Sequence, residues 1–168
     1  MRPRQIEIIP ASLDQQPVLA NLLELYVHDF SEFFGVELGP DGRFGYPQLP
    51  LYWTEPGRYP YLIRLDGKLA GFALIKREAD KWDMAEFFLL RAHRRRGIGT
   101  EIAHNIWRRL PGTWEVRVME ANAPGLAFWK RAISQFTGKP ADAVRAERNG
   151  RTWQVFTFMH PAGSAANI

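Results

Sequence analysis

The stretch EFFLLRAHRRRGIGTEIA, residues 86–103, changes character twice along its length. It begins as an apolar run typical of a buried strand, passes through an arginine-rich loop, and continues from Gly97 as a helix. Glycines at positions 97 and 99 leave the backbone uncovered where the helix begins. Because the first turn of a helix has unpaired N–H groups and a partial positive charge, this arrangement predicts a cradle for a phosphate-bearing ligand.

The glycine pattern separates several kinds of phosphate site. A dinucleotide-binding loop needs a third glycine where this chain has Ile102, and a P-loop needs a Gly-Lys-Ser/Thr sequence that does not occur here. The pattern present is Arg94-x-x-Gly97-x-Gly99, between a strand and a helix. Nucleic-acid binding by the arginines is less favoured, because the basic run is confined to one loop and acidic residues occur throughout the chain.

The composition is that of a globular domain. Of the 168 residues, 46% are hydrophobic and 24% are charged, which is close to ordinary usage. At this length one domain is expected, which we place at residues 1–160, followed by a flexible tail at 161–168. The formal net charge of +4 favours anionic ligands without identifying one.

Composition also excludes or disfavours several classes of protein. The chain has no cysteine, which rules out disulfides, thiolate metal sites and cysteine nucleophiles. Its 4 histidines lack the spacing of a metal site, so no metal is expected, and His104 is expected to be exposed on its helix. No apolar run reaches the roughly 18–20 residues of a membrane span, and the N-terminus does not resemble a signal peptide. A cytoplasmic location is therefore the expectation.

Hydrophobic periodicity predicts the order of secondary structure. Apolar residues recur every three or four positions in the helices, and Asp66-Gly67 and Asn149-Gly150 predict tight hairpin turns. The strands on either side of the helix at 97–110 must be parallel, because that connection crosses over. Strands are expected at 5–9, 61–64, 68–77, 83–90 and 113–120 and in a hairpin over 143–160, and helices at 14–34, 97–110 and 123–136.

Residues 35–60 are interrupted by glycine and proline but are rich in aromatic side chains. A disordered linker would be poor in aromatic residues, so an ordered covering segment is expected. Two interpretations stay open: the segment closes one edge of the core, or it lines a substrate pocket.

Two blocks of the sequence resemble the GNAT superfamily of N-acetyltransferases. Residues 86–103 are similar to the family's fourth strand, its Gln/Arg-x-x-Gly-x-Gly/Ala loop and its third helix, and ANAPGLAFWKRAI, residues 121–133, is similar to the segment after its fifth strand. The order of elements over about residues 5–159 matches as well. The resemblance implies a mixed α/β (α+β) fold, in which a central, mostly antiparallel sheet is splayed between a parallel strand pair and has helices on both faces.

The resemblance also implies acetyl-CoA as the cosubstrate. Backbone N–H groups from Arg95 to Thr100 would hold the pyrophosphate, with charge added by Arg94 and Arg96, and the edge of the preceding strand would hold the pantetheine arm. The implied acetyl-CoA-binding residues are Phe88, Leu89, Leu90, Arg94, Arg95, Arg96, Gly97, Ile98, Gly99, Thr100, Asn122, Phe128 and Trp129.

Glu86 is the candidate general base, since it is a lone carboxylate in an apolar strand and shares the strand face of Phe88. The alternative is that Glu86 faces solvent or pairs with a neighbouring arginine. By resemblance, the backbone N–H of Leu89 would stabilise the oxyanion. No catalytic acid is assigned, because many relatives have a tyrosine where this chain has Trp129, and an indole N–H is not an acid near neutral pH. Tyr26, Tyr52 and Tyr61 are candidate phenols, and nothing in the sequence selects one.

The predicted function is therefore N-acetyl transfer from acetyl-CoA to a primary amine, by direct transfer in a ternary complex. Two alternatives are kept: a non-catalytic CoA-binding regulatory module, favoured by Trp129, and a nucleic-acid-binding protein that uses the arginine-rich loop. The acceptor is expected to be a small-molecule or peptide amine whose identity the sequence does not reveal. No nucleic-acid or membrane partner is expected, and a homodimer is considered.

Overall fold

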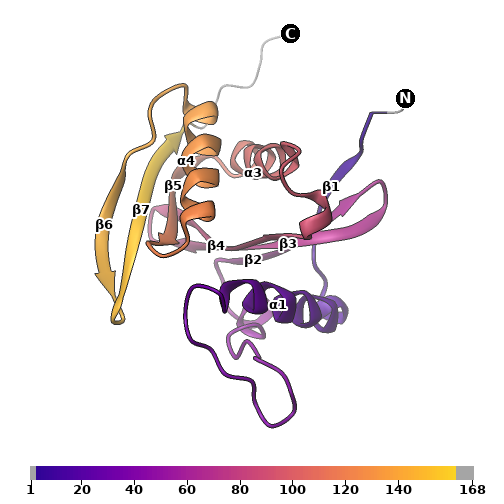
Figure 1. Ribbon diagram of the computed structural model, residues 1–168. Helices are drawn as coiled ribbons and strands as arrows, with labels where there is room; N and C mark the ends of the chain where they lie inside the picture. Colours follow the sequence, from indigo (N-terminus) through magenta and orange to yellow (C-terminus); the bar gives the residue numbers. More distant parts are fainter. Residues whose placement is uncertain (1–2, 162–168) are drawn as a thin grey trace. The chain divides into compact units, whose positions relative to one another are not determined.

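The computed structural model describes residues 3–161 (Figure 1). Residues 1–2 and 162–168, which include nearly all of the predicted tail, lie outside the described part. The strands are β1 (Ile6–Pro10), β2 (Arg58–Leu65), β3 (Lys68–Glu78), β4 (Lys81–Leu89), β5 (Gly112–Met119), β6 (Ala143–Arg148) and β7 (Arg151–His160). The helices are α1 (Gln16–Phe30), α2 (Leu51–Thr54), α3 (Ile98–Arg109) and α4 (Ala123–Thr137), with short 3-10 turns at Leu13–Gln15 and Arg91–His93.

The strands form a hydrogen-bonded sheet in the order β1-β2-β3-β4-β5-β7-β6. β4 and β5 are parallel, with Lys81–Asp83 paired to Thr113–Glu115, and α3 connects them as the sequence predicts. β1 with β2, β5 with β7, and β6 with β7 are antiparallel. The predicted fold class, a mixed α/β protein with a mostly antiparallel sheet that contains a parallel pair, is confirmed.

Two compact units make up the described chain, and each has its own core. The first unit contains the described residues up to Ile75 together with Glu86–His93. The second contains Lys76–Ala85 together with the described residues from Arg94 onward. β3 and β4 each contribute residues to both units.

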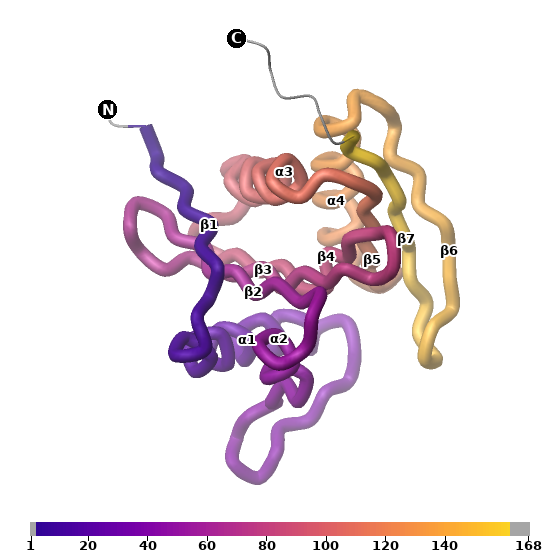
Figure 2. Tube along the Cα trace, turned by 180° about the vertical axis from the view of Figure 1, so that it is seen from behind, coloured from indigo at the N-terminus to yellow at the C-terminus, as the bar shows by residue number. Residues whose placement is uncertain are grey.

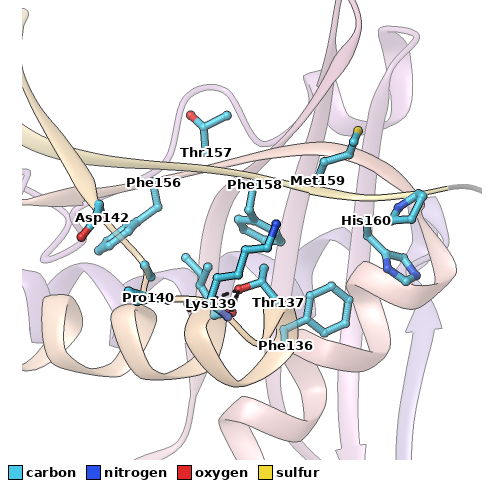
Figure 3. Close-up of a pocket in the computed structure, with 13 residues that line it drawn as sticks. Phe136, Thr137, Lys139, Pro140, Asp142, Phe156, Thr157, Phe158, Met159 and His160 are labelled. Atoms are coloured by element: carbon cyan, nitrogen blue, oxygen red, sulfur yellow. Dashed lines mark hydrogen bonds between the residues drawn. The ribbon is translucent and has the colours of Figure 1, made fainter.

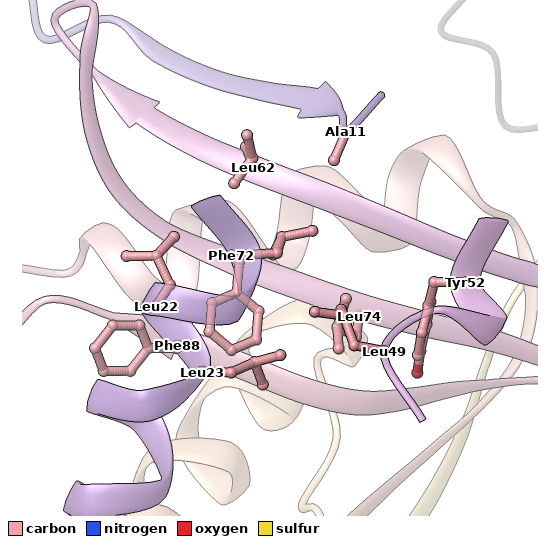
Figure 4. Close-up of a cluster of buried hydrophobic side chains, with 10 residues drawn as sticks. Ala11, Leu22, Leu23, Leu49, Tyr52, Leu62, Phe72, Leu74 and Phe88 are labelled. Carbon is pink, nitrogen blue, oxygen red and sulfur yellow. The ribbon is translucent and has the colours of Figure 1, made fainter. Parts of the chain in front are cut away.

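The core of the first unit forms where α1 packs against β2 and β3 (Figure 4). Leu19 and Leu23 of α1 are 0% and 1% exposed, and Phe72 of β3 is 0% exposed. Each such side chain contributes about 1.5–3 kcal/mol through its removal from water. The cluster consists of Ala11, Leu19, Leu22, Leu23, Leu49, Tyr52, Leu62, Phe72, Leu74 and Phe88.

The predicted end of the first helix, at residue 34, is wrong, because α1 ends at Phe30. The Ser31 hydroxyl donates to the carbonyl oxygen of His28 at 2.6 Å, and the chain then turns. Phe33 and Phe34 continue the helical spacing of apolar residues in the sequence, which is why periodicity extends the helix too far. In the structure they contact the Phe30 ring from the turn, with ring centroids 6.4 and 6.0 Å from it.

The aromatic segment at 35–60 contributes to the core of the first unit, and Figure 2 shows its path from α1 to α2. Leu49 and Tyr52 are 4% and 3% exposed. β2 begins at Arg58, three residues before the predicted start at residue 61, so that predicted boundary is wrong. Pro60 discourages a strand prediction, yet it joins the sheet through its carbonyl oxygen, which accepts the N–H of Ala11 at 2.9 Å.

The second unit has an aromatic core beneath α3 and α4, which lie side by side (Figure 1). Trp107 of α3 is 0% exposed, and its ring lies 4.7 Å from that of Phe158 and 5.0 Å from that of Phe136. The expectation that His104 is exposed is wrong. Its Nε2 lies 2.8 Å from the carbonyl oxygen of Ala132 on α4, so this side chain links the two helices.

Two carboxylates, Asp83 and Glu115, are buried on the second unit's sheet at 3% and 6% exposure. Arg117 Nη2 donates to Asp83 Oδ2 at 2.7 Å, while Glu115 accepts from Lys81 at 2.5 Å and from Arg148 at 3.2 Å. Burial raises the pKa of the Asp83 carboxyl, and the neighbouring Arg117 opposes this by lowering it. The guanidinium is therefore what makes a charged Asp83 tolerable.

Replacing Arg117 with methionine is expected to lower the free energy of unfolding by about 3 kcal/mol, because Asp83 would stay buried without its cation. The loss should shrink as the pH falls. The raised pKa of Asp83 means that folding favours its protonated form, which needs no partner. Urea unfolding at several pH values measures this. The double variant Asp83→Asn/Arg117→Met should recover part of the loss, and no recovery would show that the carboxylate is not the cause.

Candidate active site

A left-handed turn precedes α3. Arg95 and Gly97 have φ angles of +61° and +74°, and Gly97 is the N-cap of α3. Backbone N–H groups in such a turn converge to form a concave site for anions. A Cβ atom built at Gly97 would meet no atom within 4 Å, so the concavity is open.

The first turn of α3 adds further donors. The Glu101 N–H is bonded to the Gly97 carbonyl at 3.1 Å, so the preceding amides lie at the helix N-terminus, where no earlier helical carbonyl can accept from them. Ile98 is 1% exposed and anchors this end of the helix in the core. Arg95 and Arg96 are exposed next to the turn. These donors, the positive charge and the open space fit a pyrophosphate group.

The last two side chains of β4 are buried: Phe88 and Leu89 are 4% and 5% exposed. The Leu90 N–H donates to the carbonyl oxygen of Ala70 on β3 at 2.8 Å, which leaves this N–H engaged within the sheet. The carbonyl oxygen of Phe88 lies so close to Gly71 that a Cβ atom there would overlap it. Glycine at 71 is thus required for β3 and β4 to approach at this point.

The start of α4 holds the other predicted acetyl-CoA residues. Asn122 caps the helix, because its Oδ1 accepts the N–H of Gly125 at 3.0 Å. The rings of Phe128 and Trp129 pack edge to face with centroids 4.8 Å apart, and Trp129 lies 6.2 Å from Trp107. Trp129 therefore extends the aromatic core of the second unit.

Glu86, in the first unit, accepts hydrogen bonds from two phenols. Tyr26 of α1 donates to its Oε2, and Tyr46 of the aromatic segment donates to its Oε1 at 2.9 Å. The Tyr26 ring also contacts Phe88 with centroids 6.1 Å apart, so Glu86 and Phe88 do share a strand face.

Burial raises the pKa of the Tyr26 and Tyr46 phenols above the ordinary value of 10.0, and the nearby Glu86 carboxylate raises it further. Both groups therefore stay protonated and act as hydrogen-bond donors at neutral pH. Hydrogen bonds donated to a carboxylate favour its charged form.

The sequence offers Tyr26, Tyr52 and Tyr61 as candidate phenols without selecting one. In the structure, Tyr26 is the one of these three whose hydroxyl donates to Glu86. Tyr52 lies in the core of the first unit, and Tyr61 pairs with Pro10 between β2 and β1. Sequence reasoning missed Tyr46. Its position in an ordered aromatic segment was the available signal, but a contact 40 residues away along the chain has no local pattern.

A separate pocket of about 430 Å³ lies in the second unit, at the C-terminal end of α4 (Figure 3). It is lined by Phe136, Lys139 and Asp142 near that end of α4 and by Phe158 and His160 of β7, among others. None of the predicted site residues lines it. This recess is thus formed by residues outside the predicted acetyl-CoA set.

Two further observations concern residues 3–161. None of the helices there is both long and apolar enough to cross a membrane. In the same part of the chain, no three histidine, aspartate or glutamate side chains gather in a way that could hold a metal ion.

Comparison with known proteins agrees with this geometry. Residues 19–133 match the profile of the family described as Acetyltransferase (GNAT) family. This match spans more than half of the chain, and the chain belongs to that family. It is accordingly an acetyl-CoA-dependent N-acetyltransferase. A search of curated proteins found no match.

Solved structures share the fold at low sequence identity. An acetyltransferase from Thermus thermophilus is 19% identical with a TM-score of 0.68, covering 92% of this chain and 97% of its own. The PaiA N-acetyltransferase of Thermoplasma acidophilum, solved with coenzyme A, is 13% identical with a TM-score of 0.63, covering 92% and 99%. Arabidopsis thaliana NAA60, solved with acetyl-CoA, is 14% identical with a TM-score of 0.58, covering 92% and 98%.

Proposed function

We propose that this acetyltransferase moves the acetyl group of acetyl-CoA directly to a primary amine while both are bound. The observation that carries the proposal is Glu86, a carboxylate held at both oxygens by phenols within an aromatic environment. The absence of cysteine supports direct transfer, because the chain has no thiol that could carry the acetyl group as a covalent intermediate.

For acetyl-CoA, the proposed contacts follow the chain from the end of β4 into α3. The turn at Arg95–Gly97 and the first amides of α3 would hold the pyrophosphate, with Arg94 and Arg96 adding attraction. Backbone groups of Phe88, Leu89 and the Leu90 carbonyl, together with Asn122, Phe128 and Trp129, would hold the pantetheine arm. The coenzyme A and acetyl-CoA complexes of the Thermoplasma and Arabidopsis structures support this ligand.

For the reaction, Glu86 would take the proton that the amine loses, either directly or through one water molecule. The amine nitrogen forms a bond to the thioester carbonyl carbon, and the backbone N–H of Leu89 would stabilise the oxyanion that results. The carbon–sulfur bond then breaks, and the electron pair leaves with the sulfur. The products are an acetylated amine, the CoA thiolate and protonated Glu86.

For the leaving thiolate, we propose that no side chain supplies a proton. Trp129 has only an indole N–H, and the raised pKa values of Tyr26 and Tyr46 make both phenols weak acids. A thiolate is a tolerable leaving group without help, since an ordinary thiol has a pKa of about 8.5.

The acceptor is proposed to be a small-molecule or peptide amine. Asp29, near the end of α1, pairs with Arg91 at 2.5 Å, so its negative charge is partly neutralised and attracts a cationic amine less strongly.

A cytoplasmic location and a homodimeric assembly are also proposed, with no nucleic-acid partner. A panel of polyamines, amino acids, aminoglycosides and peptide N-termini would identify the acceptor class, and size-exclusion chromatography would test the dimer.

The cosubstrate is tested by thermal unfolding. Acetyl-CoA at about 100 times its Kd should add about 2.7 kcal/mol of stability, which corresponds to a rise in Tm of about 5–10 °C for a chain of this size. An unchanged Tm at saturating acetyl-CoA would contradict the proposal. Free CoA is then measured with a thiol reagent. Because the protein has no cysteine, the reagent reports only released CoA, and release that requires an amine separates acetyl transfer from binding alone.

A further inference from the structure

The segment that carries Tyr46 is hydrogen-bonded to α1 through one side chain, Glu24, and its Phe44 ring also stacks on His28 of α1 with centroids 6.4 Å apart. Glu24 Oε2 accepts the N–H of Phe44 at 2.8 Å, and its Oε1 accepts the N–H of Gly45 at 2.9 Å. The Arg43 guanidinium lies 3.6 Å from Oε1. Hydrogen bonds to a charged acceptor are the stronger kind, and here they fix the residues immediately before Tyr46.

Other contacts also bear on the path of the segment: Tyr46 packs against the core cluster of the first unit, and its carbonyl oxygen accepts the N–H of Leu49 at 3.0 Å. The N–H of Gly39 donates to the Arg43 carbonyl at 2.7 Å, which closes a small loop between these residues. Gly42 and Gly45 both have left-handed backbone conformations, with φ of +76° and +73°. Glycine populates such conformations readily but also many others, so an outside contact is needed to select one. Glu24 supplies the contact that acts directly on the backbone of residues 44 and 45.

Two residues of α1 thus reach the same carboxylate by different routes. Tyr26 donates directly to Glu86 Oε2, while Glu24 acts through residues 43–45, which place the Tyr46 hydroxyl on Oε1. Positions two apart on a helix point in directions about 200° apart, so the two routes leave α1 on different sides. They meet at the two oxygens of one side chain.

We propose that Glu24 is a positioning residue of the active site: it docks Tyr46 on Glu86, so that both oxygens of the Glu86 carboxylate are held and its ionised form is favoured. The effect on acetyl transfer rests on the proposed function, in which Glu86 is the base. The effect on the ionisation of Glu86 does not, and it can be measured in the free protein.

Charged and titratable groups also act on the two phenols that hold this carboxylate. Tyr52 of α2 acts electrostatically on both phenols, and Arg58 of β2 acts on Tyr46. His28 of α1 faces the aromatic segment through its stacking on Phe44. Arg58 also stacks on the Tyr52 ring at 5.3 Å and pairs with Glu55, so its charge is shared. Because both phenols stay protonated, neither contributes a titration of its own near neutral pH.

The test is a pH titration of the glutamate side-chain carboxyl carbons by NMR, using the full chain labelled with ¹³C-glutamate and no ligand. The signal of Glu86 is identified by its loss in Glu86→Gln. Tyr46→Phe should raise the titration midpoint of Glu86 by about one pH unit, the equivalent of one hydrogen bond to a charged group. Glu24→Ala should raise it in the same direction and to a similar extent.

The double variant Glu24→Ala/Tyr46→Phe should show no more than the shift of Tyr46→Phe alone, because both changes remove the same contact. The matched control is Arg43→Ala, which removes the ion pair of Glu24 but leaves the two backbone hydrogen bonds, and it should leave the midpoint unchanged. If Glu24→Ala unfolds, Glu24→Gln keeps an acceptor oxygen and should give a smaller shift in the same direction.

Three results would overturn the inference: a wild-type midpoint in Glu24→Ala or Glu24→Gln, a wild-type midpoint in Tyr46→Phe, or shifts of the two that add in the double variant. A merely structural role for Glu24 would lower Tm without moving the midpoint. Failure of wild-type protein to acetylate any amine would contradict the proposed function and leave this titration result intact.

Discussion

Gly97→Glu is expected to abolish acetyl-CoA binding. The substitution places a carboxylate at the N-cap of α3, where the open turn would otherwise receive the pyrophosphate. Like charges about 4 Å apart near a protein surface repel by about 4 kcal/mol, which corresponds to a loss of roughly 1,000-fold in affinity. Isothermal titration calorimetry with acetyl-CoA measures the change, and thermal unfolding without ligand shows whether the fold is kept.

Gly138→Glu is the matched control for this variant. Gly138 is also left-handed, with φ of +70° against +74° at Gly97, and a Cβ atom at either position would meet no atom within 4 Å. Both variants should therefore lose about 1–2 kcal/mol of stability through backbone strain. Only Gly97→Glu should lose acetyl-CoA binding. Retained affinity in Gly97→Glu would place the cradle elsewhere, and equal loss in both variants would assign the effect to instability.

Elements with a local cause could be predicted from the sequence. The helix expected at 97–110 is found at 98–109, and the strand expected at 68–77 is found at 68–78, because apolar periodicity and glycine or proline stops act over a few residues. The parallel pairing of β4 with β5 followed from the crossover through α3. These features need no knowledge of the distant parts of the chain.

The sequence-based predictions are wrong where contacts between distant parts of the chain determine the local structure. Apolar periodicity extends the first helix to residue 34, but the chain turns after Phe30, and Phe33 and Phe34 contact the Phe30 ring from that turn. The short helix α2 was not predicted inside the proline-rich segment, where packing of Tyr52 into the core stabilises it. In both places tertiary packing outweighs local propensity.

The candidate site also combines features that have a local cause in the sequence with contacts that depend on the fold. The start of α3 at Gly97 could be predicted, because it depends on consecutive residues and on a glycine at the N-cap, and the phosphate cradle there stays a prediction. Glu86 was found as a lone carboxylate in an apolar strand. Its partners Tyr26 and Tyr46 lie 60 and 40 residues away along the chain, and only the fold brings them together.

Glu86→Gln is expected to reduce the turnover number by about 100- to 10,000-fold, the usual contribution of a general base. Glutamine has nearly the same shape and keeps one acceptor oxygen for the phenols, so the surroundings of the site should persist. Its amide cannot take the proton of the amine. The Kd of acetyl-CoA should stay within about twofold, since none of the proposed contacts to the nucleotide involves this side chain. Steady-state release of CoA and calorimetry measure the two quantities separately.

Glu115→Gln is the matched control, because it changes a carboxylate of the same length that is likewise enclosed, with a side chain 8% exposed. Glu115 bonds to Lys81 and Arg148, so its replacement weakens ion pairs that stabilise the second unit. It should lower Tm while leaving turnover near the wild-type value. A general effect of removing a buried negative charge would slow both variants equally, whereas a base at Glu86 slows only Glu86→Gln. Full activity in Glu86→Gln would exclude Glu86 as the base and shift proton removal to water or to the acceptor itself.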